Sequence, residues 1–366
     1  MREKNKGNWT CWEKLQHFHK NKRVLITGHT GFIGSWLTKC LSTMGADILG
    51  YSLEPPSKPC MYDAISLSKD LTDLRKDVRD KESLKKAIQE FEPEIVFHLA
   101  AQPIVLESYD NPLETFETNV MGTVNLLESL RRVDSAKVII VMTSDKVYRN
   151  NEWVYPYRET DPLGGKDPYS ASKSAQDIVV NSFRKSYFGN MGVGISSIRA
   201  GNVIGGGDWG ANRIVPDIVR GLTEGNIIRV RNPDSVRPWQ YVLEPISGML
   251  LLAQRMWDDI KFSGEWNFGP NNEREITVKE LVNNFLKNWG GGSYTVAKDN
   301  EAREASYLQL DISKAKSVLS WLPKYNFEES IEETVEWYKA YYKDKRNINN
   351  VTEKQIKAYF ESGNYD

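Results

Sequence analysis

The sequence predicts an α/β protein with a doubly wound, Rossmann-like parallel sheet and a smaller C-terminal lobe. Three observations predict this fold. Short apolar runs of strand length alternate with helical segments as far as residue 200. The first run, residues 23–27, ends in a glycine turn that opens a helix. Further along, Tyr169 and Lys173 lie four residues apart on one face of another expected helix.

The strands and helices follow one another in regular alternation. Strands are expected at residues 23–27, 46–51, just before Asp77, 94–98, 137–142 and 193–199. Helices are expected at residues 35–44 and 81–91, from Thr118-Asn119 onward, and from Pro168 onward. Asp167 is the expected N-cap of the last helix, and Asp80 that of the helix at 81–91.

The composition changes near residue 200, where a glycine-rich segment follows the sixth strand. We expect residues 23–199 and 232–258 to form a dinucleotide-binding domain. Residues 200–231 and 259–366 are then the substrate-binding domain. Residues 1–22 are expected to form a tail, which Trp9, Trp12 and Phe18 can hold to the body.

The overall composition narrows the function classes. Hydrophobic residues make up 40% and charged residues 27%, with a net charge of −1, which argues against nucleic acid or an anionic membrane as partner. No apolar run reaches about 18 residues, and the N-terminus lacks the apolar core of a signal peptide. Three cysteines without C-x-x-C spacing and four histidines without ligand spacing predict a cytoplasmic protein with no metal site.

The glycine turn Gly28-x-x-Gly31-x-x-Gly34 indicates a dinucleotide site, because backbone N–H groups at a helix N-terminus face a pyrophosphate. After the second strand stands Ser52 in place of the usual ribose-binding acid, with Glu54 two residues on. No arginine stands in the segment directly after Ser52, residues 53–57, to attract a 2′-phosphate, and Glu54 would repel one. We therefore expect NAD rather than NADP.

The Tyr169-x-x-x-Lys173 pair indicates proton transfer. A phenol titrates near about 10. An ammonium one helical turn away favours the phenolate, so the pair can supply a base near neutrality. The residues Thr143-Ser-Asp-Lys146 follow the fifth strand, at the sheet edge where ligands bind in such folds.

Taken together, these motifs resemble the extended short-chain dehydrogenase/reductase superfamily over residues 22–342. Within it, the chain is similar to the CDP-glucose 4,6-dehydratases. The similarity lies in residues 27–32, 97–103, 143–148, 199–209, 231–233, 237–245 and 266–270. Asp145-Lys146 is its most specific part, because most sugar-nucleotide dehydratases resemble one another in carrying Asp-Glu there.

The resemblance implies bound NAD and a reaction without net redox change, with CDP-glucose as substrate. Hydride leaves C4 of the hexose, a proton leaves C5, hydroxyl leaves C6, and the hydride returns to C6. Tyr169 would take the C4 hydroxyl proton, with Lys173 on the nicotinamide ribose. Thr143 would hydrogen-bond the C4 oxygen, Asp145 would protonate the departing hydroxyl, and Lys146 would remove the C5 proton.

Ligand contacts are expected from the glycine turn, the strand ends and the inter-domain loops. The expected cofactor-binding residues are Gly28, Thr30, Gly31, Phe32, Ile33, Gly34, Asp77, Val78, Leu99, Ala100, Ala101, Gln102, Asn119, Thr143, Tyr169 and Lys173. The expected substrate-binding residues are Gln102, Ser144, Asn202, Asp208, Arg213, Arg237 and Tyr307. Arg237 and Arg213 are candidates for a bidentate clamp on the substrate pyrophosphate.

Other functions remain open on the same fold, because fold does not fix function. The protein can act as a dehydratase on another nucleotide hexose or heptose, or as a C4 epimerase. An epimerase needs no acid/base pair for elimination, so Asp145-Lys146 favours the dehydratase. A silent cofactor-binding protein would be expected to lose Tyr169 or Lys173, and neither is lost.

A homodimer is also expected. The helices that begin near Asn119 and Pro168 carry more apolar residues than one sheet face requires. These residues are Val120, Val124, Leu127, Ile178, Val179 and Phe183. Pairing the two helices across a two-fold axis would bury them in a four-helix interface.

Overall fold

Seven parallel strands form the central sheet, in the order β10-β6-β5-β4-β1-β2-β3. The computed structural model describes residues 10–271, 274–297 and 307–362. The strands are β1 (Arg23–Thr27), β2 (Asp47–Ser52), β3 (Thr72–Arg75), β4 (Ile95–His98), β5 (Val138–Met142), β6 (Gly194–Arg199) and β10 (Gly264–Asn267). The doubly wound parallel sheet is thus confirmed.

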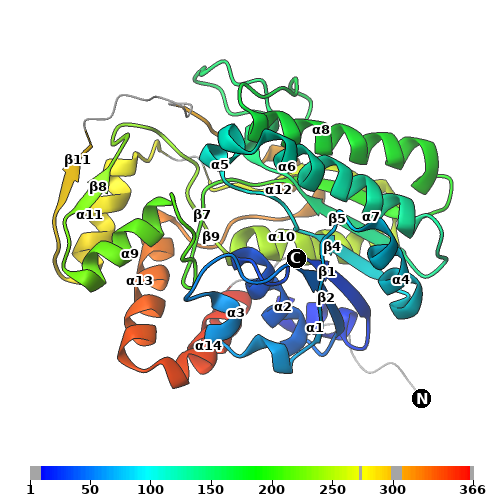
Figure 1. Ribbon diagram of the computed structural model, residues 1–366, viewed down its shortest axis with the longest axis horizontal. Coiled ribbons are helices and arrows are strands. Elements are labelled where there is room, and N and C mark those ends of the chain that lie inside the picture. The colour runs from blue at the N-terminus through cyan, green and yellow to red at the C-terminus, as the bar shows by residue number, and fades with distance from the viewer. Residues whose placement is uncertain (1–9, 272–273, 298–306, 363–366) are drawn as a thin grey trace.

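Helices cover both faces of this sheet (Figure 1). One face carries α4 (Lys81–Phe91), α7 (Gly122–Leu130) and α8 (Pro168–Phe183). The other carries α1 (Cys11–His19), α2 (Phe32–Thr43), α10 (Leu243–Asp258) and α14 (Ile348–Glu361). Each face has its own buried apolar core, as expected when both sides of a parallel sheet are covered.

The smaller lobe is built from short strands and helices beyond β6. It contains two parallel strand pairs, β7 (Val203–Ile204) with β9 (Gln240–Tyr241) and β8 (Ile228–Val230) with β11 (Tyr294–Val296). Its helices are α9 (Ile214–Glu224), α11 (Val278–Trp289) and α13 (Phe327–Lys343). In Figure 1 these elements lie together on one side of the sheet domain.

Short helical segments complete the described chain. These are α3 (Met61–Ala64), η2 (Leu67–Lys69), α5 (Val105–Asp110), α6 (Pro112–Phe116), η3 (Glu117–Met121), η4 (Asp145–Val147), η5 (Arg184–Phe188), η6 (Ile260–Phe262), α12 (Ser313–Leu319) and η7 (Lys345–Asn347). Segments η3 and η5 are π-helical turns. They extend the helical stretches that run into α7 and out of α8.

The structure departs from the expected domain limits at three places. Residues Cys11–His19 are a packed helix and not part of a tail, with Trp12 and Leu15 buried against the core. Trp9 lies outside the described residues. The strand Gly264–Asn267 pairs with β6 in the main sheet, although it was expected in the substrate-binding domain. The C-terminal helix α14 packs on α1 and α2, so it too belongs with the sheet domain.

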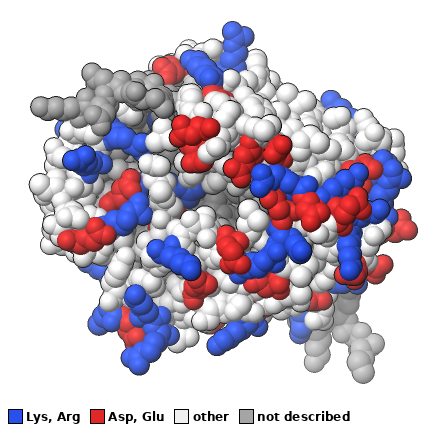
Figure 2. All heavy atoms as spheres, in the orientation of Figure 1, with Lys and Arg blue, Asp and Glu red and all other residues white. Residues whose placement is uncertain are grey.

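Acidic and basic side chains are interspersed over the face shown in Figure 2. In the described ranges, no helix is long and apolar enough to cross a membrane. The same ranges contain no group of three or more His, Cys, Asp or Glu side chains placed to hold a metal ion.

Candidate active site

The carboxyl ends of β1, β4, β5 and β6 open onto a cleft of about 690 Å³. Most of its walls come from residues within 28–34, 52–61, 76–78, 99–106, 142–146, 200–217 and 229–239, and from the start of α8. Strand order reverses between β1 and β4, and ligands bind at this point in doubly wound sheets. The cleft therefore lies where the fold places a ligand site.

The glycine turn between β1 and α2 forms part of the cleft wall. Gly28 has φ +76°, and a Cβ there would lie 2.6 Å from the Ala100 nitrogen. A Cβ on Gly34 would lie 2.1 Å from the Gly28 carbonyl oxygen. The close approach of neighbouring backbone atoms thus requires glycine at both positions. The sequence alone did not reveal this cause. Gly31, the N-cap of α2, has no side-chain cap, so the first N–H groups of α2 are left for an anion.

The end of β2 carries no acid. The Ser52 hydroxyl shares a 2.8 Å hydrogen bond with the Thr30 hydroxyl. Arg75 of β3 pairs in register with Ser52, and its guanidinium donates to the Leu53 carbonyl at 3.2 Å. Sequence reasoning missed this arginine, because its proximity arises from strand pairing. Its charge is paired with Asp73 at 2.8 Å.

Most of the expected cofactor-binding residues line the cleft. Those that do are Gly28, Thr30, Gly31, Phe32, Ile33, Gly34, Asp77, Val78, Leu99, Ala100, Ala101, Thr143, Tyr169 and Lys173. Gln102 and Asn119 do not. The Asn119 carboxamide accepts from the Gln102 N–H at 2.8 Å and donates to its carbonyl oxygen at 3.1 Å. The two hydrogen bonds between these residues therefore stabilise the loop after β4, although neither residue lines the cleft.

The turn after β5 carries Asp145 and Lys146, which the sequence resemblance assigned to elimination. The Ser144 hydroxyl accepts from the Lys146 N–H at 3.2 Å and donates to Asp145 Oδ1 at 3.0 Å. Asp145 is 2% exposed, and its Oδ2 has no hydrogen-bond partner among the described residues. Gly201 packs directly against this carboxyl group, since a Cβ there would lie 2.0 Å from Oδ2. Asp145 thus lines the cleft with one buried carboxylate oxygen whose hydrogen-bonding capacity is unused among the described residues.

The start of α8 supplies the predicted phenol and ammonium. Asp167 accepts from the Ser170 N–H at 2.9 Å, which confirms the predicted N-cap. Burial raises the pKa of Tyr169 to about 12 and lowers the pKa of Lys173 to about 7. The expected lowering of the phenol pKa is therefore wrong for the protein alone. Burial disfavours the phenolate, and the same burial deprives Lys173 of its full charge near neutrality.

The turn after β5 faces the start of α8 across the cleft. Lys146 Nζ lies 5.8 Å from the centroid of the Tyr169 ring, within cation–π range. The Thr143 hydroxyl donates to the Ile198 carbonyl at 2.9 Å, and its oxygen lies 3.3 Å from Asp177 Oδ2. With its hydrogen directed into the protein, the oxygen of Thr143 can accept a hydrogen bond from a ligand hydroxyl.

The substrate lobe closes the other side of the cleft. Ser144, Asn202, Asp208, Arg213 and Arg237 line it as expected. Asp208 and Arg213 form an ion pair at 3.0 Å.

The residues that line the substrate side of the cleft differ in part from those expected. Tyr307 lies outside the cleft lining, and its hydroxyl donates to Glu275 at 2.9 Å. Sequence reasoning missed Arg229 and Arg231, which also line the cleft. Their i, i+2 spacing at β8 places them on one side of the strand and was the available signal. Tyr148, two residues after Lys146, is 1% exposed and does not line the cleft.

A doubly wound sheet with this glycine turn, a strand-end threonine and a Tyr-x-x-x-Lys helix under a second lobe defines the extended short-chain dehydrogenase/reductase class. The family model for GDP-mannose 4,6 dehydratase matches residues 25–334, and the chain belongs to this family. It is 47% identical to the CDP-glucose 4,6-dehydratase of Salmonella typhimurium, over 89% of this chain and 93% of the relative.

Solved structures show the same fold. The UDP-glucose 4-epimerase of Thermus thermophilus in complex with NAD has a TM-score of 0.75 at 26% identity, covering 87% of this chain and 99% of that one. The dTDP-glucose 4,6-dehydratase of Bacillus anthracis in complex with NAD has a TM-score of 0.74 at 23% identity, covering 89% and 99%. The resemblance stated from the sequence motifs is confirmed by the family match and the 47% identity.

Proposed function

We propose that the protein is an NAD-dependent nucleotide-sugar 4,6-dehydratase and that its substrate is CDP-glucose. One observation carries the proposal: Asp145-Lys146 follows the end of β5 in the wall of the cleft, with Lys146 facing Tyr169. Groups for oxidation at C4 and for elimination across C5–C6 thus share one cavity. The 47% identity to a CDP-glucose 4,6-dehydratase supports this choice of reaction and substrate.

We propose the following residue roles, which the geometry of the cleft supports. Thr143 hydrogen-bonds the C4 oxygen, and Tyr169 takes the proton of the C4 hydroxyl. Asp145, with its unpartnered oxygen, protonates the departing C6 hydroxyl. Lys146 removes the C5 proton, which the C4 ketone makes acidic. Lys173, held by the Met142 carbonyl at 3.2 Å, contacts the nicotinamide ribose.

The glycine turn and the uncapped N-terminus of α2 fit the pyrophosphate of NAD. When bound, NAD supplies a reversible hydride acceptor and, in its oxidised form, a positive charge that favours the Tyr169 phenolate. NAD is favoured over NADP because Arg75, the arginine nearest Ser52 in register, is paired with Asp73 and lies 3.7 Å from Glu54. A 2′-phosphate would have to compete with both carboxylates.

The protein is further proposed to act as a homodimer through the outer face of the helices from α6 to η5. Large apolar side chains are exposed there: Leu113, Phe116, Met121, Ile178 and Tyr187. Leu127, expected in this interface, is buried in the core and does not belong to it.

Three buried free thiols, Cys11, Cys40 and Cys60, are consistent with the reducing cytoplasm expected from the sequence.

Incubation with a panel of nucleotide hexoses tests the reaction. The proposal expects loss of one water from CDP-glucose, scored by mass, and little from UDP-, GDP- or dTDP-glucose. Interconversion of hexose epimers without a change in mass would instead establish the C4 epimerase. Loss of water from another nucleotide hexose would retain the dehydratase and correct the substrate.

A further inference from the structure

We propose that Tyr148, Arg199 and Asp177 are positioning residues that hold the Asp145-Lys146 turn against helix α8. None of the three lines the cleft. The inference rests on the proposed dehydratase function and deepens it: the hydroxyl of Tyr148 serves the elimination step more than the oxidation step.

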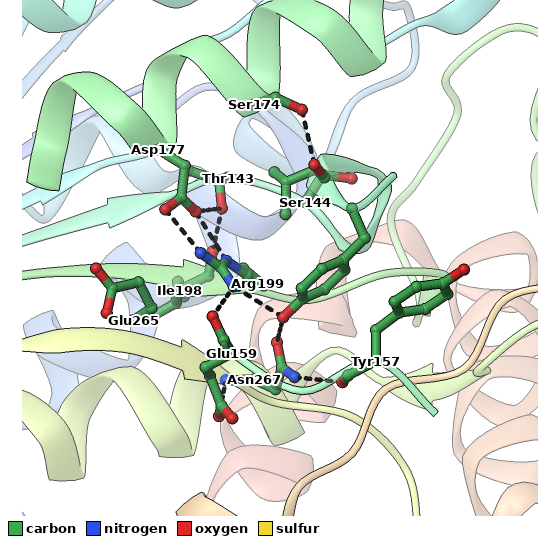
Figure 3. Close-up of polar contacts among 12 residues, drawn as sticks. Thr143, Ser144, Tyr157, Glu159, Ser174, Asp177, Ile198, Arg199, Glu265 and Asn267 are labelled. Atoms are coloured by element: carbon green, nitrogen blue, oxygen red, sulfur yellow. Dashed lines mark hydrogen bonds and ion pairs between the residues drawn. The ribbon is translucent and has the colours of Figure 1, made fainter. Parts of the chain in front are cut away.

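Arg199 is the centre of this arrangement (Figure 3). It is the last residue of β6 and is 2% exposed. Its Nε and Nη2 each donate to one oxygen of Asp177, both at 2.9 Å. Its Nη1 donates to the Tyr148 hydroxyl at 2.9 Å and to the Glu159 carbonyl at 3.0 Å. The planar guanidinium thus joins α8 to the segment that follows the elimination pair.

Tyr148 fixes the far end of the elimination turn. It is the residue directly after η4, two positions beyond Lys146. Its hydroxyl donates to Asn267 Oδ1 at 2.6 Å, and its ring stacks on Tyr157 with centroids 5.1 Å apart. Because both its ring and its hydroxyl are held, Tyr148 limits the movement of Lys146.

A second contact ties the same turn to α8. The Ser174 hydroxyl donates to the Val147 carbonyl at 2.7 Å. Ser174 follows Lys173 directly, so the contact lies beside the catalytic helix residues. The turn is therefore held by two independent contacts, one at the Val147 carbonyl and one at the Tyr148 side chain. Together they set the distance between the Asp145-Lys146 pair and Tyr169.

Asp177 connects the same arrangement to the oxidation step. It lies one helical turn beyond Lys173, and its Oδ2 is 3.3 Å from the Thr143 hydroxyl oxygen. It is 1% exposed and ion-paired with Arg199. A buried ion pair adds little stability over apolar packing, but loss of one partner leaves an uncompensated charge. A role in fixing geometry therefore explains this pair better than a role in stability.

The substitution Tyr148→Phe tests the inference, since it removes one oxygen and keeps the stacked ring. A misplacement of about 1 Å in an active site can lower the rate about 10²-fold. We expect product formation from CDP-glucose to fall by about 10- to 100-fold while KM changes little. C4 oxidation should be slowed less, so absorbance of the reduced nicotinamide should accumulate after rapid mixing to a higher level than in the wild type.

Tyr359→Phe is the matched control. Its hydroxyl is equally buried and bonds the Glu244 carboxylate at 2.5 Å and the Ser247 hydroxyl at 3.1 Å, in α14 outside the cleft. This variant should lose thermal stability but show no accumulation of reduced nicotinamide. If Tyr148→Phe fails to fold, Ser174→Ala, which removes the contact to Val147, must show the same pattern.

The outcomes separate this inference from the proposed function. Suppose that the wild type turns over normally. A Tyr148→Phe variant that is unimpaired, or that is slowed equally in oxidation and elimination, then overturns the inference and leaves the proposed function intact. A wild-type protein that releases water from no nucleotide hexose overturns the proposed function and the inference together.

Discussion

Replacing Gly201 by alanine tests whether the Asp145 carboxylate must stay where the structure places it. The backbone of Gly201 does not require glycine, so only the added Cβ matters. The three atoms nearest to that Cβ all belong to the Asp145 carboxyl group: Oδ2 at 2.0 Å, Cγ at 2.1 Å and Oδ1 at 2.6 Å. Ordinary contact begins at 3.4 Å, so relative to 2.0 Å the carboxylate must move by about 1.4 Å.

This displacement sets the size of the expected effect. A shift of about 1 Å can cost about 10²-fold in rate, so Gly201→Ala should lower kcat by at least about 100-fold. Overpacking costs about 1–3 kcal/mol, so Tm should fall by several degrees while the circular dichroism spectrum is retained. Water loss from CDP-glucose, followed by mass, measures the rate.

A double-mutant cycle supplies the control. In an Asp145→Ala background the atoms that meet the new Cβ are gone, so Gly201→Ala should lower Tm much less than in the wild type. Two results would refute the reasoning: wild-type kcat in Gly201→Ala, or an equal loss of Tm in both backgrounds.

Three further predictions concern Lys146, Lys173 and the outer helices. Lys146→Ala should bind the cofactor and oxidise C4 but stall before water is lost, seen as reduced-nicotinamide absorbance without product; near wild-type turnover would contradict it. Burial lowers the pKa of Lys173 to about 7 from 10.5, so between these values the unfolded chain binds more protons than the folded protein. We therefore compare the Tm of the cofactor-free wild type with that of Lys173→Met. The wild-type Tm minus the variant Tm should be constant below pH 7 and should rise with pH from about 7 to 10.5. A difference that does not change with pH would count against this prediction. Ile178, 57% exposed, is expected at the dimer interface, so Ile178→Asp should give a monomer by light scattering, whereas a wild-type monomer at micromolar concentration would rule out the dimer.

Local patterns predicted most of the sheet, because strand length and glycine turns are encoded in neighbouring residues. His98 lies at the end of β4 as a buried core residue, and its ring nitrogens lie 2.6 Å from the Thr27 hydroxyl and 3.0 Å from the Thr123 hydroxyl. The helix Cys11–His19 was missed because its lysine-rich surroundings resemble a tail, although its Thr10–Glu13 capping box was a readable signal.

Contacts between distant segments could not be predicted from the sequence. The position of Arg75 beside Ser52 depends on the register of β2 with β3. The pair Asp177–Arg199 joins α8 to β6 only once both have packed on the sheet. The raised pKa of Tyr169 follows from burial, which spacing to Lys173 does not reveal.

The fate of the hydrogen at C4 tests the central claim most directly. CDP-glucose deuterated at C4 should yield a 4-keto-6-deoxy product that carries the deuterium at C6, because Tyr169 and the Asp145-Lys146 pair act on one bound sugar in one cleft. Deuterium that stays at C4 in an epimerised sugar, or that is lost to water, would contradict the account.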